Sequence, residues 1–297
     1  MSIDTYIASA GRGSLASGFH ARSPRHLIGA RSATRWMQFA NAVTRTGVHM
    51  LMGLLLPAAL VGGWWLAVRS ELLAPQILPA PLLVWETAID LISSGDLFYQ
   101  LGVSLARLAV GLVCGGSLGL VFGLLFGLSR RLDTYVAPTV RAIFLVPSLG
   151  WLPFFMLLFG IGETLKIVMI AKTCFLPLMV NVYGAIQTLP TKYDDVSRAL
   201  ELDRRAHLRC VVLPAIVPAI ATGLRQALGK GWKIIILVEM ISSAAGIGYL
   251  MMWGRKSFQL DVVFVTMVVV GVVGLIFDRS VVWLQNRVAD WSLHTAA

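Results

Sequence analysis

The chain has 297 residues, of which 57% are hydrophobic and only 13% are charged, and its mean hydropathy is +0.77. Soluble domains carry roughly 25% charged residues, so this composition argues against a water-soluble globule. The length suits about six membrane helices of about 20 residues each, with their connecting loops. The net charge of +10 comes from basic residues spread over short loops, without a nucleic-acid-binding motif. We therefore predict an integral membrane protein in contact with lipid, and no nucleic acid partner.

Six apolar segments follow one another along the chain, and each can cross roughly 30 Å of hydrocarbon at about 1.5 Å per residue. They cover about 47–68, 101–128, 142–162, 165–189, 213–240 and 262–286. A very short turn around Gly160 to Thr164 separates the third segment from the fourth, and these two should form a tight helical hairpin. The predicted fold class is an all-α membrane bundle of about six transmembrane helices.

Lys and Arg residues are unequally distributed between alternate connections. Sixteen lie in the N-terminal tail, after the second and fourth segments, and at the C-terminal end, whereas four lie on the opposite side. Cytoplasmic loops carry the excess of basic residues, so both termini and the 190–212 loop are predicted to be cytoplasmic. Residues 1–46 are interpreted as a basic cytoplasmic tail rather than a transit peptide. Residues 47–77 then hold the first membrane helix and a periplasmic connection, and 289–297 a short C-terminal tail.

Five glycines stand at strict four-residue spacing in the second segment: Gly111, Gly115, Gly119, Gly123 and Gly127. Such spacing places a ridge without side chains on one face of a helix, which lets a second helix approach closely in lipid. We predict a helix-packing seam within the bundle, with a dimer contact as the less favoured use.

Ionisable side chains within the apolar segments are candidate functional groups, because a charge at membrane depth needs a partner or water. These residues are Arg107, Lys172, Arg225, Lys230, Lys233 and Glu239. Arg107 and Arg225 lie near segment ends, from which their guanidinium groups can also reach the headgroups. Lys172 and Glu239 lie deeper, and could pair with each other or face an aqueous path. We predict a translocation pathway near Arg107, Lys172 and Glu239.

No residue pattern typical of catalysis is present. HExxH and GxSxG motifs are absent, and Gly223 to Gly231 has five residues between its first two glycines where a Walker A loop has four. Cys114, Cys174 and Cys210 are far apart and include no CxxC pair, so neither a disulfide framework nor a zinc site is indicated. We predict that this chain is not an enzyme and contains no catalytic residues, metal site or ATP-binding site.

The loop after the fourth segment is the longest on the predicted cytoplasmic side. Tyr193, either Val196 or Ser197, and Leu200 recur at helical spacing, and Asp203 is placed to cap a second short helix. This pattern predicts a helix, a turn and a helix at the membrane surface, with an apolar strip for a partner. An amphipathic loop lying on the headgroups is the plainer interpretation.

At its end this loop resembles the EAA loop of binding-protein-dependent ABC importer permeases. Val211-Val212-Leu213-Pro214 matches the end of that motif, and counting back puts Asp195, Val196 and Ser197 at the Glu-Ala-Ala positions. From Leu78 to about Val288 the chain resembles the nitrate/sulfonate/taurine branch of the family. The stretches that carry this resemblance are Leu78–Pro81, Ser104–Arg107, Gly123–Ser129, Val146-Pro147, Phe159–Gly162, Val238-Glu239 and Ala245–Leu250.

The resemblance implies a type I importer permease core over residues 78–288, acting as half of a dimeric pore with a second permease copy or a paralogue. In that family, a periplasmic binding protein delivers solute, and ATP and Mg are bound by a dimer of cytoplasmic ATPase subunits. The implied location is the bacterial inner membrane, and the implied solute is small and anionic, such as a sulfonate, taurine or nitrate. The residues implied in coupling to the ATPase are Tyr193, Asp195, Val196, Ser197, Leu200, Glu201, Asp203, Leu213 and Pro214.

Glu201 stands where the family has a glycine. Glycine would permit a left-handed turn, which glutamate adopts only with strain of about 1 kcal/mol or more. Either the turn is built differently, with Asp203 stabilising it, or the docking surface is adapted to a particular ATPase. A heterodimer with a second permease bearing a regular loop is a third possibility.

Two other classes of protein compete with this interpretation. A secondary transporter driven by an ion gradient would need a midplane site built from inverted repeats, and the sequence contains no clear internal repeat. A structural scaffold would need no catalytic or transport residues, and the sequence does not exclude it.

Overall fold

The computed structural model describes residues 55–70 and 77–294. Every regular element in these ranges is helical. The predicted tail 1–46 and the start of the first apolar segment lie outside the described residues, and the remainder of that segment belongs to the helix Leu55–Arg69. The chain divides into two units, Met1–Gly63 and Trp64–Ala297, and the description below concerns the second.

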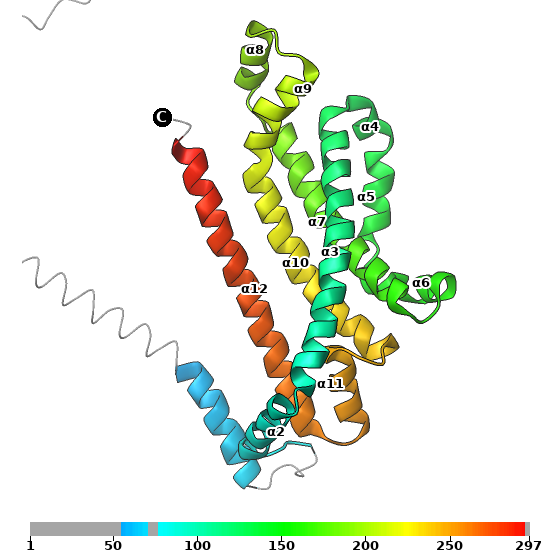
Figure 1. The fold of residues 1–297 in the computed structure, drawn as a ribbon, viewed down its shortest axis with the longest axis vertical. Coiled ribbons are helices and arrows are strands. Elements are labelled where there is room, and N and C mark those ends of the chain that lie inside the picture. Colours follow the sequence, from blue (N-terminus) through cyan, green and yellow to red (C-terminus); the bar gives the residue numbers. More distant parts are fainter. Residues whose placement is uncertain (1–54, 71–76, 295–297) are drawn as a thin grey trace, which may run out of the picture. The chain divides into compact units, whose positions relative to one another are not determined.

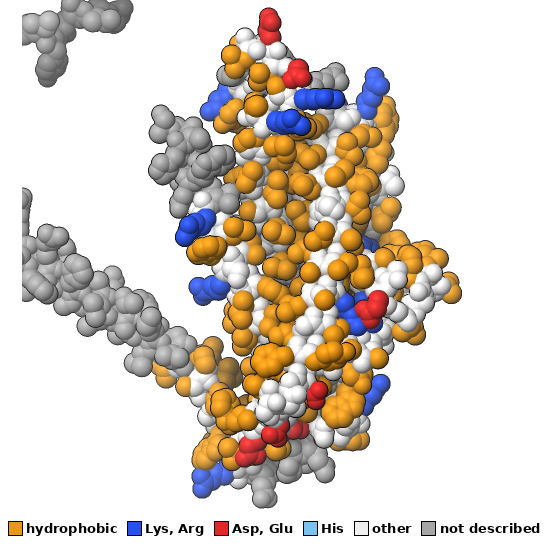
Figure 2. Space-filling view, viewed as in Figure 1, with side chains coloured by type: hydrophobic (Ala, Val, Ile, Leu, Met, Phe, Trp, Pro, Cys, Tyr) orange, Lys and Arg blue, Asp and Glu red, His pale blue; other side chains and the backbone are white. Residues whose placement is uncertain are grey.

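Four helices in the described part of the chain are long and apolar enough to cross a membrane. They are α3 (Asp96–Leu128), α7 (Glu163–Gln187), the continuous helix Arg205–Ser242 that contains α10 (Leu213–Ser242), and α12 (Leu260–His294). Hydrophobic side chains cover the sides of these helices, as Figure 2 shows, which suits a lipid environment. The fold class predicted from the sequence, an all-α membrane bundle, is confirmed.

The third apolar segment was predicted to be one continuous span over 142–162, and the structure differs from this prediction. The segment is split into α5 (Ala137–Leu145), the short 3-10 turn η1 (Ser148–Trp151) and α6 (Leu152–Phe159), with a bend of 91°. Pro147 explains the break, because a residue before proline is driven out of the helical region, and Val146 is extended at φ −68° and ψ 124°. Pro153 lies in the first turn of α6, where proline is tolerated.

The glycine ridge of α3 faces α7. A Cβ atom added at Gly115 or Gly119 would collide with the backbone of α7 at Ala171 or Phe175, and one added at Gly127 would meet the side chain of Ile186. The two helices therefore approach each other closely along most of their length, in a seam that lies within the bundle.

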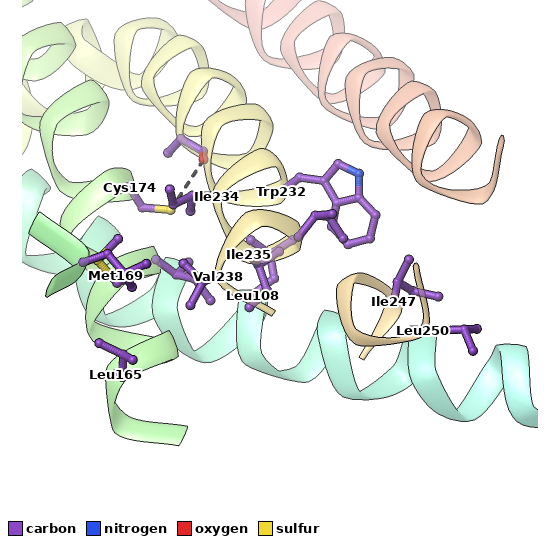
Figure 3. Close-up of a cluster of buried hydrophobic side chains, with 14 of the residues drawn as sticks. Leu108, Leu165, Met169, Cys174, Trp232, Ile234, Ile235, Val238, Ile247 and Leu250 are labelled. Carbon is purple, nitrogen blue, oxygen red and sulfur yellow. Dashed lines mark hydrogen bonds between the residues drawn. The ribbon is translucent and has the colours of Figure 1, made fainter. Parts of the chain in front are cut away.

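The hydrophobic core lies where α10 packs against α3 and α7, and Figure 3 shows part of it. Leu108 of α3, Met169 of α7 and Ile235 and Val238 of α10 are almost wholly buried. The Cys174 thiol donates a hydrogen bond to the Ala227 carbonyl at 3.4 Å, which ties α7 to α10 in the same region. This core holds the three helices as one unit.

Short helices lie at the two ends of the bundle (Figure 1). At one end are α4 (Arg130–Tyr135), α8 (Thr191–Ala199) and α9 (Arg204–His207). At the other are α2 (Pro81–Ser93) and α11 (Ile247–Lys256). Thr87 of α2 donates a hydrogen bond to Asp261 at the start of α12, 2.6 Å away. At its other end, α12 remains helical to His294, so the predicted tail 289–297 is helical over most of its length.

Candidate functional site

Arg107 lies on α3 and is the centre of a buried polar network. Its Nε and Nη2 atoms donate to the two carboxylate oxygens of Glu163, each at 2.6 Å, and Nη1 donates to Glu239 Oε1 at 2.8 Å. The same Nη1 lies 2.7 Å from the Ala245 carbonyl oxygen. Planar guanidinium groups bind carboxylates in this two-pronged way. One side chain thus joins α3, the start of α7, the end of α10 and the turn before α11.

Glu239 is almost fully buried and satisfied by several donors. Besides Arg107, its carboxylate accepts hydrogen bonds from Ser104 Oγ at 2.8–2.9 Å and from the Gly248 N–H at 3.0 Å. Gly246 allows this arrangement. Its φ of +113° is rare for residues with side chains, and a Cβ there would overlap the Glu239 carboxylate.

The network is balanced in charge. Lys166 Nζ lies 2.8 Å from Glu163 Oε1, so two cations face two carboxylates. Because charges removed from water are tolerated only when paired, this balance accounts for the burial of Arg107, Lys166 and Glu239. The arrangement fixes the turn between α10 and α11, and no cation in it is left without a carboxylate.

Four members of the network were not among the predicted site residues: Gln100, Ser104, Glu163 and Lys166. Ser104 Oγ accepts from the Ile247 N–H at 2.9 Å, and Gln100 Oε1 accepts from the Gly246 N–H at 2.6 Å. A signal for two of them was available, since Gln100, Ser104 and Arg107 recur at helical spacing and so share one face of α3. Glu163 and Lys166 are brought in by tertiary structure.

Of the two alternatives left open for Lys172 and Glu239, their mutual pairing is wrong. The ammonium group of Lys172 lies over the rings of Phe144 and Trp151, 5.1 and 5.4 Å from their centroids, whereas Glu239 binds Arg107 and Ser104. Lys172 projects toward α5 and η1 because it occupies a different face of α7 from the one that packs against α10. Arg107 and Glu239 therefore share one site, and Lys172 belongs to another.

Arg225 is held by a neighbouring helix. Its Nε and Nη2 atoms lie 2.8 and 2.7 Å from Asp278 Oδ1 of α12. An ion pair between α10 and α12 thus replaces the headgroup contact that its position near a segment end suggested.

The turn between α8 and α9 is left-handed, with Glu201 at φ 49°. The Leu202 N–H donates to the Ser197 carbonyl at 3.0 Å. This is the hydrogen bond of a Schellman motif, in which the residue after the left-handed one bonds back to the last turn of the helix. Asp203 Oδ1 accepts from the Ala206 N–H at 2.7 Å and caps α9, as the sequence predicts. Glutamate therefore adopts the conformation of a glycine turn, and Asp203 starts the next helix.

The helices α8 and α9 present both buried and exposed side chains. Ser197 is buried, and its hydroxyl lies 2.8 Å from His207 Nδ1 and donates to the Tyr193 carbonyl. Tyr193 and Leu200 are 40% and 65% exposed, and Asp195, Glu201 and Asp203 are also exposed. The Val196 side chain lies outside the description. Large apolar side chains on an exposed end are typical of a contact surface.

The helix pair is joined to α10 without a break. From Arg205 to Ser242 the chain forms one helix, in which Leu208–Val212 is a π-helical turn placed directly before Leu213 and Pro214. Proline cannot donate a backbone hydrogen bond, and π turns relieve such local misfits. Helix α9 is therefore continuous with α10, whose far end holds Glu239.

These features define a multi-pass membrane protein with an exposed helix pair that continues into one spanning helix. The model of the family described as "Binding-protein-dependent transport system inner membrane component" matches residues 115–290. The chain belongs to this family and is a permease component of an ABC importer, so the resemblance in the sequence is confirmed. Family membership does not favour the alternative of a carrier driven by an ion gradient.

Several curated relatives match most of the chain. The putative aliphatic sulfonates transport permease protein of Bacillus subtilis is 34% identical over 81% of this chain and 87% of its own length. The nitrate import permease protein of Leptolyngbya laminosa is 32% identical over 77% and 84%, and the taurine transport system permease protein of Escherichia coli is 28% identical over 79% and 87%.

A solved structure shares the fold. A chain of the inward-facing MetNI methionine ABC transporter aligns with a TM-score of 0.55 at 20% identity, over 62% of this chain and 92% of that chain. The fold is accordingly that of a type I ABC importer permease.

Proposed function

We propose that the protein forms the membrane path for a small anionic solute, of the sulfonate, taurine or nitrate class, in the bacterial inner membrane. The observation that carries this proposal is the 34% identity to a sulfonate permease together with similar matches to nitrate and taurine permeases. An excess of cations over carboxylates in the predicted spans is in keeping with an anionic solute.

Energy would come from a separate dimer of ATPase subunits that binds ATP and Mg. The surface for this partner would be α8 and α9, with Tyr193, Leu200 and Asp195 exposed and Val196, Glu201, Asp203, Leu213 and Pro214 completing the segment. The unbroken helix from Arg205 to Ser242 supports the proposal, because a docked helix pair could then move a spanning helix as a rigid lever.

The remaining partners would be a second permease copy or paralogue and a periplasmic binding protein that delivers solute. The end of the bundle with α4, α8 and α9 would be cytoplasmic, together with both termini, because the excess of Lys and Arg falls on these connections. The network of Arg107 and Glu239 would then lie toward the periplasmic end, where it would hold the helices around the solute path together.

Uptake by proteoliposomes tests the proposal. The permease is reconstituted with its ATPase and binding protein, and uptake of labelled taurine, methanesulfonate and nitrate is measured, with the cation putrescine as control. We expect ATP-dependent uptake of at least one of these three probes, each of which is nitrate or carries a sulfonate group, and none of putrescine. Uptake driven by a proton gradient without the ATPase, or uptake of putrescine alone, would contradict the proposal.

A further inference from the structure

One face of α10 carries a polar stripe at membrane depth. Thr222, Gln226, Lys230 and Lys233 recur at spacings of four, four and three residues, and all four are exposed. At about 1.5 Å per residue, Lys230 and Lys233 lie about 4 and 8 Å from the middle of α10. Apolar Leu237 and Ile241 continue the same face toward the end of the helix. The polar part is therefore centred on α10.

Within the described part of the chain, the two lysines have no carboxylate partner. Among the described residues, neither Lys230 nor Lys233 forms an ion pair or a hydrogen bond, whereas Arg225 on the adjoining face is paired with Asp278. Figure 2 shows basic side chains part-way along the bundle, between stretches of hydrophobic surface, as well as at its ends. Two cations so close to the middle of a span cannot face hydrocarbon without a large free-energy cost.

A groove opens beside this stripe, between α10 and α12. It encloses about 300 Å³, and Lys233, Trp232, Gly274 and the Arg225–Asp278 pair are among the groups that line it. This volume is at the lower end of the range for small-molecule sites, which suits a compact solute. Lys233 belongs to both the groove and the stripe, so the groove continues onto the polar face.

We infer that Lys230 and Lys233 line the water-filled solute path and bind the anionic group of the solute, with the groove between α10 and α12 receiving its remaining part. This inference rests on the proposed function, and it assigns the anion contact to α10 rather than to Arg107 or Lys172. Arg107 is engaged by Glu163 and Glu239, and Lys172 is covered by two aromatic rings. Lys230 and Lys233, by contrast, are exposed and have no ion-pair partner among the described residues, so an anion can approach them.

Thiol accessibility tests the water-filled path without knowledge of the solute. Lys233→Cys is made in the assembled transporter after the exposed Cys114 and Cys210 are replaced by Ser, with buried Cys174 retained. Val113→Cys is the matched control, since Val113 is 69% exposed and near the middle of α3 but on an apolar face. Two methanethiosulfonates of similar size serve as probes, one bearing a sulfonate and the other a quaternary ammonium.

We expect the sulfonate probe to modify Lys233→Cys about tenfold faster than the ammonium probe, because Lys230 raises the local concentration of anions. Adding Lys230→Gln should remove this preference, and Val113→Cys should remain unmodified. A Lys233→Cys thiol that neither probe reaches would place this face against lipid or protein and overturn the inference. Equal rates for the two probes would overturn the role of charge.

Transport separates this inference from the proposed function. In the proteoliposome assay, Lys230→Gln with Lys233→Gln should lower uptake of the imported anion about tenfold or more, while the Lys→Arg pair should keep most of it. Assembly with the ATPase should be unchanged in both. Unchanged uptake by the Gln pair would refute the inference while the proposed function stood, and a wild-type transporter that imports none of the anions would refute both.

Discussion

Arg107 of α3 and Glu239 of α10 lie 132 residues apart in the sequence, and their side chains meet at 2.8 Å in the protein interior. The pair fixes the end of α10 to α3 at the point where the chain turns into α11. Glu163 completes the site from α7 by taking the other two donors of the guanidinium group.

The two carboxylates of this network should differ in their contribution to stability. Glu239→Gln leaves part of a buried charge uncompensated, at a cost of about 3 kcal/mol or more. Glu163→Gln should cost less because the Glu163 side chain is 58% exposed and water can replace part of its interaction. Thermal unfolding in nanodiscs should give a lower Tm for Glu239→Gln than for Glu163→Gln. The reverse order would show that the Arg107–Glu163 pair contributes more to stability than the Arg107–Glu239 pair.

Gly246 should not tolerate a side chain. Gly246→Ala places a methyl group against the Glu239 carboxylate and also requires a rare backbone conformation at φ +113°. We expect a large loss of monodisperse protein in fluorescence-detected size exclusion. Gly184→Ala is the control, because its Cβ meets nothing within 4 Å and alanine favours the helix. Similar yields for the two variants would show that the turn before α11 can be rearranged.

The seam between α3 and α7 predicts a second contrast between glycines. A side chain at Gly115 would overlap the backbone of Ala171, whereas one at Gly102 on the same helix would meet nothing within 4 Å. Gly115→Val should therefore separate α3 from α7 and lower the Tm strongly, and Gly102→Val should change it little. Equal Tm values would mean that α7 does not approach α3 as closely as described here.

The left-handed turn at Glu201 should become less strained with glycine. Glu201→Gly removes a conformational cost of about 1 kcal/mol and should increase protection of the α8–α9 amides in hydrogen exchange, whereas the β-branched Glu201→Val should decrease it. Assembly with the ATPase is expected to follow the same order. Greater protection with valine than with glycine would be inconsistent with the observed turn.

Much of the fold could be predicted from the spacing of apolar residues and glycines along the chain. The errors in the predicted fold arise from tertiary contacts, which this spacing does not determine. The four-residue glycine spacing indicates a helix-packing face because a local pattern fixes which side of α3 lacks side chains. The prediction of one span over 142–162 missed the break before Pro147, and the bend of 91° depends on how α5 and α6 pack. Pairing of Lys172 with Glu239 was one of two alternatives, and Arg107 was not considered as the partner, since the pairing depends on how α7 and α3 are rotated about their axes.

In the candidate site, too, local features could be predicted and tertiary contacts could not. The helix cap formed by Asp203 follows from a local sequence rule, and the left-handed turn at Glu201 lies where the family motif has its glycine. Glu163 and Lys166 begin α7 at a turn, and nothing in their immediate sequence shows that they reach Arg107. The pairing of Arg225 with Asp278 joins helices 53 residues apart and likewise depends on the packing of α10 against α12.

We propose that α8 and α9 transmit the work of a separate ATPase to the membrane bundle. The most direct test of this proposal is ATP-dependent uptake of the imported anion by the whole transporter carrying Asp195→Lys with Leu200→Asp, two exposed positions on this surface. We expect loss of ATPase assembly and of uptake, while the Tm of the isolated permease stays within about 2 °C of the wild-type value, as for other surface substitutions. Normal assembly and normal uptake by this variant would contradict the proposal.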